Sequence, residues 1–224
     1  MYDDKSRALL VEAEYLGKTP IQKGIREYML CLSCEKRLNV YETYVAKLWK
    51  KDFPEMVQDN MFIMKDIDYG LFRLFHLSIL WRASVSTLDF FKHVSLGKHE
   101  EIIRTMILNY DPGKADQYSF IPRIVYDTDK KNIHAIAEPL QAKQDGFTFY
   151  NFSFGGVMWE YMVSVQSCRK LSNTYPFFSE EGKLCLTTEN IFENERFKTV
   201  GKKLVEQHSL KKQRDSLSRK GVTF

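Results

Sequence analysis

The chain has 224 residues, of which 44% are hydrophobic and 28% charged, with 11 Gly and 6 Pro; these proportions are ordinary for a globular protein and exclude collagen-like and low-complexity chains. The net charge is +4, from 33 Lys and Arg against 29 Asp and Glu. Residues 202–220 hold seven cations and two carboxylates and therefore carry +5, which leaves −1 for the rest of the chain.

Membrane and secretory signals are absent from the sequence. The most apolar stretch, Ile67–Val85, contains Asp68, Arg73, His76 and Arg82, which a single membrane span tolerates poorly. The start, MYDDKSRALL, has acids where a signal peptide needs basic residues and an apolar run. Four cysteines do not make a disulfide framework. We therefore expect a cytoplasmic protein with no membrane partner.

The N-terminal quarter predicts a strand and a first helix. Ala8–Tyr15 fits either a strand or a short helix, and Ile25–Leu30 predicts a strand that leads into Cys31. Glu35–Lys51 has one apolar stripe at helical spacing, and Pro54 ends the helix. The stripe consists of Leu38, Tyr41, Val45, Leu48 and Trp49.

Two further helices follow. Ile67–Val85 is apolar nearly all round, which is typical of a helix buried at the centre of a fold. Arg82 lies in this helix, four residues after Ser78, and buried charge must be paired. We therefore expect Arg82 to have a fixed acidic or carbonyl partner. Lys98–Tyr110 predicts the next helix, which an Asp-Pro-Gly sequence ends.

After residue 115 the pattern is that of strands. Four segments alternate or run with β-branched and aromatic residues between Asp- and Gly-rich turns, which predicts an antiparallel meander. They are Phe120–Tyr126, Ile133–Glu138, Phe147–Phe154 and Val157–Val165. Asn194–Gln213 predicts a final helix with a basic end.

These elements predict an α+β fold: an N-terminal strand, a CxxC motif and a helix, then central helices, an antiparallel β-meander and a basic C-terminal helix. The expected domains are residues 1–115, the helical region, and residues 116–224, the sheet with the last helix. The two can also form one compact domain.

The sequence Cys31-Leu32-Ser33-Cys34 is the strongest chemical motif. Two thiolates at this spacing, at a strand-to-helix turn, supply half of a structural zinc site, which needs four ligands. We therefore predict Cys31 and Cys34 as zinc ligands of an incomplete set. A redox pair, for which a thioredoxin-like βαβ context is expected, and two purely structural thiols are the alternatives.

Glu35 and Glu42 are the candidate catalytic carboxylates. They lie seven residues apart, near enough to two helical turns to share a face. With the two cysteines they could hold a hard divalent cation, Mg²⁺ or Mn²⁺ in a nuclease. The alternative is a solvated helix face with ordinary ion pairs.

The basic C-terminal segment supplies the candidate nucleic-acid contacts. Lysine and arginine neutralise phosphates, and they also suit a solvated helix end, where cations are favoured. The candidates are Lys202, Lys203, Lys211, Lys212 and Arg214.

Three stretches resemble HNH-type (ββα-metal) proteins of bacteria and phages. They are Gly24–Trp49 (GIREYMLCLSCEKRLNVYETYVAKLW), Phe72–Ser86 (FRLFHLSILWRASVS) and Leu96–Leu108 (LGKHEEIIRTMIL), so the likeness covers about residues 20–112. In that family a strand ends in LLCxxCE and the next helix carries a spaced YE or WE pair. The resemblance implies that Cys31 and Cys34 are the second of two CxxC pairs.

The same family has two features that this sequence lacks. A first CxxC and a segment like SHIIPxF precede the shared region there, and the histidine in that segment activates water for attack on a phosphodiester. Either the chain starts late relative to a longer gene, or it is a natural relative without nuclease activity.

Three functions are expected. The leading one is an HNH-nuclease-related protein of phage defence or mobile-element biology, associated with nucleic acid and with an incomplete catalytic site. The second is a non-enzymatic protein–protein module, an inhibitor, complex subunit or homo-oligomer, with the aromatic segment Phe147–Trp159 as its surface. The third is an active metal-dependent nuclease that uses Glu35, Glu42 and a histidine.

Overall fold

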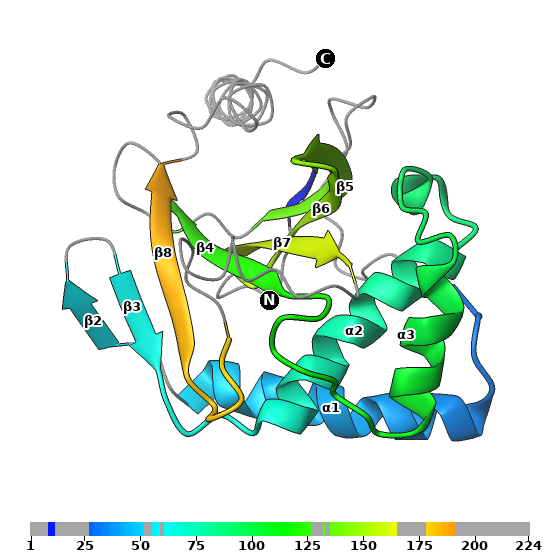
Figure 1. The fold of residues 1–224 in the computed structure, drawn as a ribbon, viewed down its shortest axis with the longest axis horizontal. Coiled ribbons are helices and arrows are strands. Elements are labelled where there is room, and N and C mark those ends of the chain that lie inside the picture. Colours follow the sequence, from blue (N-terminus) through cyan, green and yellow to red (C-terminus); the bar gives the residue numbers. More distant parts are fainter. Residues whose placement is uncertain are drawn as a thin grey trace, which may run out of the picture.

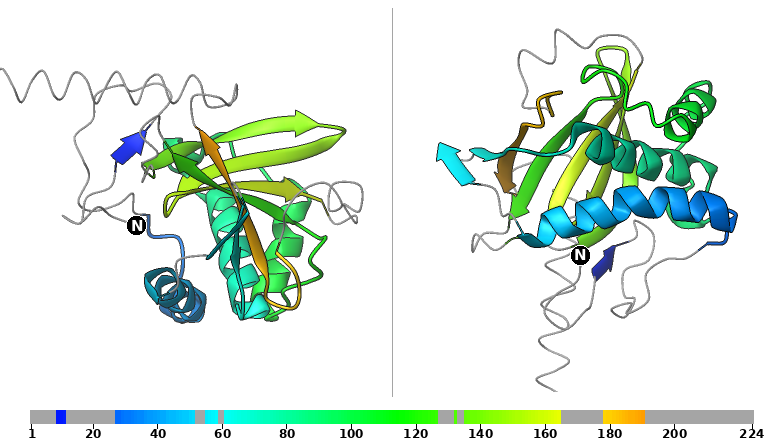
Figure 2. Two further views of the ribbon diagram at one scale, coloured as in Figure 1. Left: turned by 90° about the vertical axis from the view of Figure 1, so that its left-hand side faces the viewer. Right: turned by 90° about the horizontal axis from the view of Figure 1, so that it is seen from below.

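The structure is a computed structural model that describes residues 9–11, 27–51, 55–58, 61–126, 132, 135–164 and 178–190. This part of the chain contains the helices α1 (Leu32–Lys51), α2 (Tyr69–Val85) and α3 (His99–Leu108), with a short 3-10 helix at Asp89–Phe91. The α-helices lie together on one side of the sheet, and α2 packs against both α1 and α3 (Figures 1 and 2).

The described strands form one mixed eight-stranded sheet in the order β1-β5-β6-β7-β4-β8-β3-β2. The pairs β1–β5 and β4–β8 are parallel, and the other neighbours are antiparallel. The bounds are β1 (Leu9–Val11), β2 (Glu55–Gln58), β3 (Met61–Met64), β4 (Phe120–Tyr126), β5 (Ala135–Gln144), β6 (Phe147–Phe154), β7 (Val157–Val163) and β8 (Leu184–Asn190).

Local hydrogen bonds fix where the first two helices begin. The carbonyl of Cys31 accepts the backbone N–H of Glu35 at 3.0 Å, so Cys31 is the N-cap residue of α1. The carboxylate of Asp68 accepts the backbone N–H of Leu71 at 2.8 Å and caps α2. The side chain of Asp68 thereby satisfies an amide that lacks a partner within the helix.

One hydrophobic core joins the helices to the sheet. Phe72 of α2 is fully buried and packs between the rings of Phe120 on β4 and Trp159 on β7, with centroids 6.1 and 6.2 Å away. The same core cluster contains residues of α1, α2, α3, β4, β6, β7 and β8. It therefore includes residues from both sides of position 115.

The α+β class predicted from the sequence is confirmed. Two strands, Phe120–Tyr126 and Phe147–Phe154, begin and end at the predicted residues. The three predicted helices are also present. The sheet, however, is mixed rather than a plain antiparallel meander, because β1 and β8 join it in parallel. The strands β2, β3 and β8 were not predicted, and the helix expected over Asn194–Gln213 lies outside the described residues.

The strand predicted before the CxxC motif is wrong in its described part, residues 27–30, which form no strand. The carboxylate of Glu27 instead accepts hydrogen bonds from the hydroxyl of Ser86 and from the backbone N–H and hydroxyl of Thr87. This segment is therefore tied to the C-terminal end of α2 by side-chain contacts rather than by a ladder.

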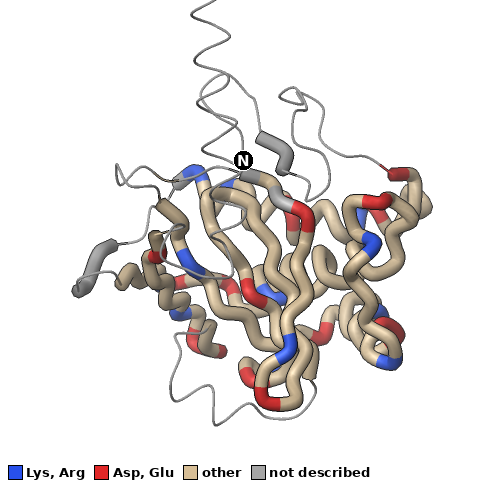
Figure 3. The backbone as a smooth tube through the Cα atoms, turned by 90° about the horizontal axis from the view of Figure 1, so that it is seen from above, with Lys and Arg blue, Asp and Glu red and all other residues tan. Residues whose placement is uncertain are grey.

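In the described part of the chain, no helix is long and apolar enough to cross a membrane. Lysine and arginine are interspersed with aspartate and glutamate along the described backbone (Figure 3).

Candidate functional site

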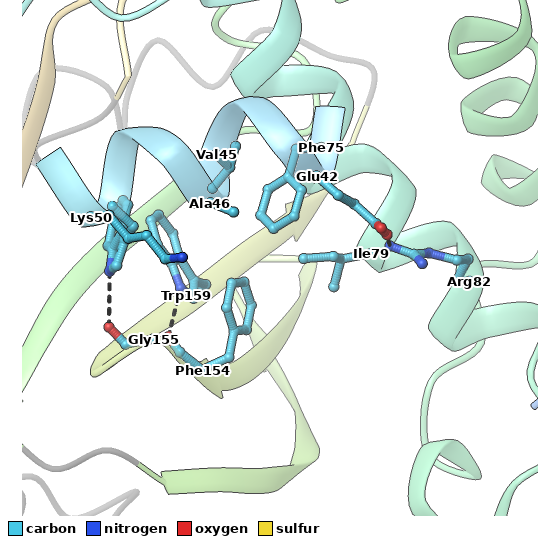
Figure 4. Close-up of a pocket in the computed structure, with 11 residues that line it drawn as sticks. Glu42, Val45, Ala46, Lys50, Phe75, Ile79, Arg82, Phe154, Gly155 and Trp159 are labelled. Carbon is cyan, nitrogen blue, oxygen red and sulfur yellow. Dashed lines mark hydrogen bonds and ion pairs between the residues drawn. The ribbon is translucent and has the colours of Figure 1, made fainter. Parts of the chain in front are cut away.

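A pocket of about 440 Å³ lies where α1 and α2 meet the turn between β6 and β7 (Figure 4). Its walls are mostly apolar and include four aromatic rings. The lining residues are Glu42, Val45, Ala46, Trp49, Lys50, Phe75, Ile79, Arg82, Phe154, Gly155 and Trp159.

The β6–β7 turn builds the floor of the pocket. Gly155 and Gly156 have φ angles of +65° and +73°, the conformation that two-residue hairpin turns need and that glycine adopts without strain. The turn places Phe154 and Trp159 side by side, with stacked rings 5.5 Å apart. The indole N–H of Trp49 donates to the carbonyl of Gly155 at 3.2 Å and thereby joins α1 to the turn.

Charged groups lie at two ends of the pocket. The guanidinium of Arg82 pairs with the carboxylate of Glu42 at 2.8 Å and donates to the carbonyl of Ser78 at 3.2 Å. The acidic or carbonyl partner predicted for Arg82 is thus confirmed. Lys50 lies on α1 at the other end, beside the turn (Figure 4), and makes no ion pair with the described residues. Two cations and one carboxylate therefore line the pocket, a net charge of +1.

Buried polar groups lie behind the aromatic wall. Nδ1 of His76 lies 2.6 Å from the hydroxyl oxygen of Tyr161, and its ring lies 4.3 Å from those of Trp159 and Phe120. Nε2 of His76 is buried and has no hydrogen-bond partner among the described residues. Burial first, and then the nearby positive charge of Arg73, hold the pKa of His76 well below its ordinary value.

Arg73 is buried without a carboxylate partner among the hydrogen bonds and ion pairs of the described residues. Its guanidinium instead donates to the carbonyls of Tyr118 at 2.9 Å, of Lys114 at 3.4 Å and of Gln117. Burial lowers the pKa of Arg73, although an arginine stays charged throughout the usual range. This charge is thus part of the scaffold that connects α2 to the segment before β4.

The two cysteines of the CxxC motif differ in environment. Cys31 is exposed at the N-cap of α1, and its sulfur lies 3.0 Å from the hydroxyl of Ser33. Hydrogen bonds from that hydroxyl, from the backbone N–H of Cys34 and from the Cys34 thiol lower the pKa of Cys31 to about 7. Cys34 is half-buried, and its hydrogen bond to Cys31 and its burial raise its pKa.

In the described residues, the predicted zinc ligands and the predicted carboxylates do not form one metal-binding cluster. No group of three or more His, Cys, Asp or Glu side chains there could hold a metal ion. Glu35 is exposed at the first turn of α1, and Glu42 lies two turns later in its ion pair with Arg82. The zinc, Mg²⁺ and Mn²⁺ sites stay predictions.

Two other surfaces were expected from the sequence, the basic C-terminal segment and the aromatic segment Phe147–Trp159. The basic residues proposed to contact nucleic acid, Lys202, Lys203, Lys211, Lys212 and Arg214, lie outside the described residues. The aromatic segment Phe147–Trp159 is largely buried, because Phe149, Tyr150, Phe152 and Trp159 are core residues. It therefore does not present the exposed aromatic patch on which the interaction hypothesis was based.

Sequence reasoning missed the pocket. The sequence places Trp49 in the apolar stripe of the first helix and Phe154 and Trp159 in an aromatic strand segment. The signals that could have found it are the high aromatic content, 14% of the chain, and the Gly-Gly turn between two aromatic strands. Neither signal says which helix faces that turn.

Comparisons of the chain with protein-family models, with curated proteins and with solved structures found no match. The resemblance to HNH-type proteins therefore stays a prediction.

Proposed function

We propose that the protein is a binding protein whose pocket between α1, α2 and the β6–β7 turn takes an aromatic ligand that carries an acidic group. The observation that supports this is the pocket itself, with its aromatic walls and few charged groups at the ends. Ligand sites in proteins are typically concave, mostly apolar and about 300–1,000 Å³ in volume, with a few polar groups that orient the ligand.

The walls favour a flat apolar body. Trp49, Phe75, Phe154 and Trp159 offer ring faces and edges, and aromatic pairs contribute about 0.5–1.5 kcal/mol beyond the burial of their area. A ring system that buries about 150 Å² of apolar surface gains roughly 4 kcal/mol from burial, before the entropy lost on binding is subtracted. This gain alone corresponds to a Kd of about 1 mM, to which the ring contacts add, so the walls suit a bicyclic ligand.

The charges favour an acid on the ligand. Arg82 is already paired with Glu42, which neutralises one cation and holds its guanidinium in place. Lys50 is the cation left without an ion pair in the described structure. An anionic group at the Lys50 end would neutralise the net positive charge of the pocket, although solvent exposure limits this contribution.

The test uses 8-anilinonaphthalene-1-sulfonate (ANS), a fluorescent aromatic anion. We expect one saturable site per chain in the full protein. Ala46 is exposed on α1 and lines the pocket, so Ala46→Phe should fill it and weaken ANS binding at least about tenfold, or about 1.4 kcal/mol. Val40→Phe is the matched control, since Val40 is exposed on the same helix but does not line the pocket.

The acidic group is tested with N-phenyl-1-naphthylamine, which has the ring system of ANS without the sulfonate. ANS should bind more tightly than this neutral probe, and Lys50→Met should remove the difference. Equal binding of both probes to the wild type would overturn the preference for an acid. Equal ANS binding to the Ala46→Phe and Val40→Phe variants would overturn the pocket as the binding site.

A further inference from the structure

The CxxC motif at the start of α1 forms a second site, one that the proposed pocket does not use. We propose that Cys31 and Cys34 form a reversible disulfide by exchange with small-molecule disulfides of the glutathione type. This activity is independent of ligand binding in the pocket.

The spacing along the chain places the two cysteines side by side. Cys31 and Cys34 are three residues apart at the first turn of α1, and residues at this spacing are neighbours on a helix surface, about 5–6 Å apart at Cβ. A disulfide needs a Cβ separation of about 3.5–4.5 Å. Both cysteines are free thiols in the structure.

Because of the position of Cys31, the two Cβ atoms can come within disulfide distance without unwinding α1. Cys31 is the N-cap residue, so its carbonyl accepts the bond from Glu35 while the residue itself lies before the first helical position, Leu32. A cap residue has non-helical backbone angles. A small rotation about the Cα–C bond of Cys31 therefore moves its side chain while its carbonyl, and with it the hydrogen bonds of α1, stays in place.

The different solvent exposure of the two thiols determines which one reacts first. Cys31 is exposed, with the exposed side chain of Leu32 beside it, whereas Cys34 is half-buried. A disulfide from solution can therefore reach Cys31 first, and Cys34 then resolves the intermediate.

The exchange has two steps. The Cys31 thiolate attacks one sulfur of glutathione disulfide and forms a mixed disulfide, while one glutathione leaves as its thiolate. The Cys34 thiol then loses its proton to solvent and attacks the Cys31 sulfur, and the second glutathione leaves. Two protein thiols are oxidised to one disulfide, and one glutathione disulfide is reduced to two molecules of glutathione.

The experiment uses the full chain with Cys168→Ser and Cys185→Ser, so that only the two motif thiols remain. The reduced protein is incubated with glutathione disulfide, and its free thiols and mass are measured. We expect both thiols to be lost together, with the mass of an internal disulfide, and dithiothreitol to restore them. Thiols that persist in excess glutathione disulfide would overturn the proposal.

Two further variants separate the roles in the same background. Cys34→Ser should accumulate the mixed disulfide on Cys31, because the resolving thiol is missing. Cys31→Ser should react at least about tenfold more slowly, since Cys34 is less accessible. Equal rates in the two variants would overturn the assigned order. Zinc bound at one ion per chain, held through Cys31 and Cys34 in purified protein and blocking both thiols, would overturn the exchange and favour the zinc site.

Discussion

Acidification should destabilise the protein through His76, which is 1% exposed and has one ring nitrogen without a hydrogen-bond partner in the described part of the chain. A proton added there would create a cation in an aromatic core next to the charge of Arg73. The folded state therefore resists protonation, whereas the unfolded state takes up the proton in the ordinary range near pH 6.5.

The direction and size of this change in the free energy of unfolding follow from proton linkage. The folded-state pKa of His76 is depressed, so the unfolded state binds more protons below about pH 6.5, and the free energy of unfolding falls as pH falls through that range. A histidine that stays neutral in the fold down to pH 5 costs about 2 kcal/mol between pH 7 and pH 5. That change raises the unfolded fraction roughly 25-fold.

Urea unfolding followed by tryptophan fluorescence at pH 7, 6 and 5 measures this loss. His76→Asn keeps a polar group near the Tyr161 hydroxyl but cannot titrate, so the variant should lose about 2 kcal/mol less than the wild type over this interval. His99→Asn is the control. Nδ1 of His99 also lies near a tyrosine hydroxyl, at 3.0 Å from Tyr118, and burial and then Lys98 lower its pKa too; because this histidine is only half-buried, the variant should keep the larger part of the wild-type pH dependence. The same pH dependence in wild type and His76→Asn would refute the reasoning.

Two further pairs of variants, each a test and its control, examine backbone conformation and charge placement by urea unfolding. Gly182→Ala should cost about 3 kcal/mol or more, because Gly182 has a φ of +74° and a Cβ there would lie 2.1 Å from the carbonyl oxygen of Ile67. Gly146→Ala, at φ +80° with nothing within 4 Å, should cost only about 1 kcal/mol; equal losses would contradict the clash. Arg73→Met should cost about 3 kcal/mol, because it leaves buried carbonyls without their donor. Arg104→Met removes only an exposed ion pair within α3 and should leave the urea midpoint unchanged; similar shifts in both arginine variants would contradict the structural role of Arg73.

The sequence predicts secondary structure correctly where an element depends only on residues that are close together in the chain. Phe120–Tyr126 and Phe147–Phe154 combine β-branched and aromatic residues with turn residues beyond their ends, and the strands have these bounds. The all-round apolar character of Ile67–Val85 predicts a central helix, because only a helix covered on all sides can bury such a surface.

Non-local features could not be predicted in the same way. β8 pairs in parallel with β4, whose paired residues lie 64 positions earlier in the chain, and no local pattern determines which strand will be its neighbour. The pocket could not be predicted for the same reason, since Trp49, Phe75 and Trp159 come from three elements that meet only after folding. The CxxC motif was visible in the sequence, but the different exposures of its two thiols depend on where α1 begins.

The three tryptophans allow the most direct test of the proposed pocket. Trp49 and Trp159 line it, whereas Trp81 on α2 does not, and each indole N–H gives one signal in a ¹H–¹⁵N correlation spectrum. On titration with ANS, the signals of Trp49 and Trp159 should shift and saturate together while that of Trp81 stays in place. Unchanged Trp49 and Trp159 signals at saturating ANS, or an equal shift of all three, would contradict binding in the pocket.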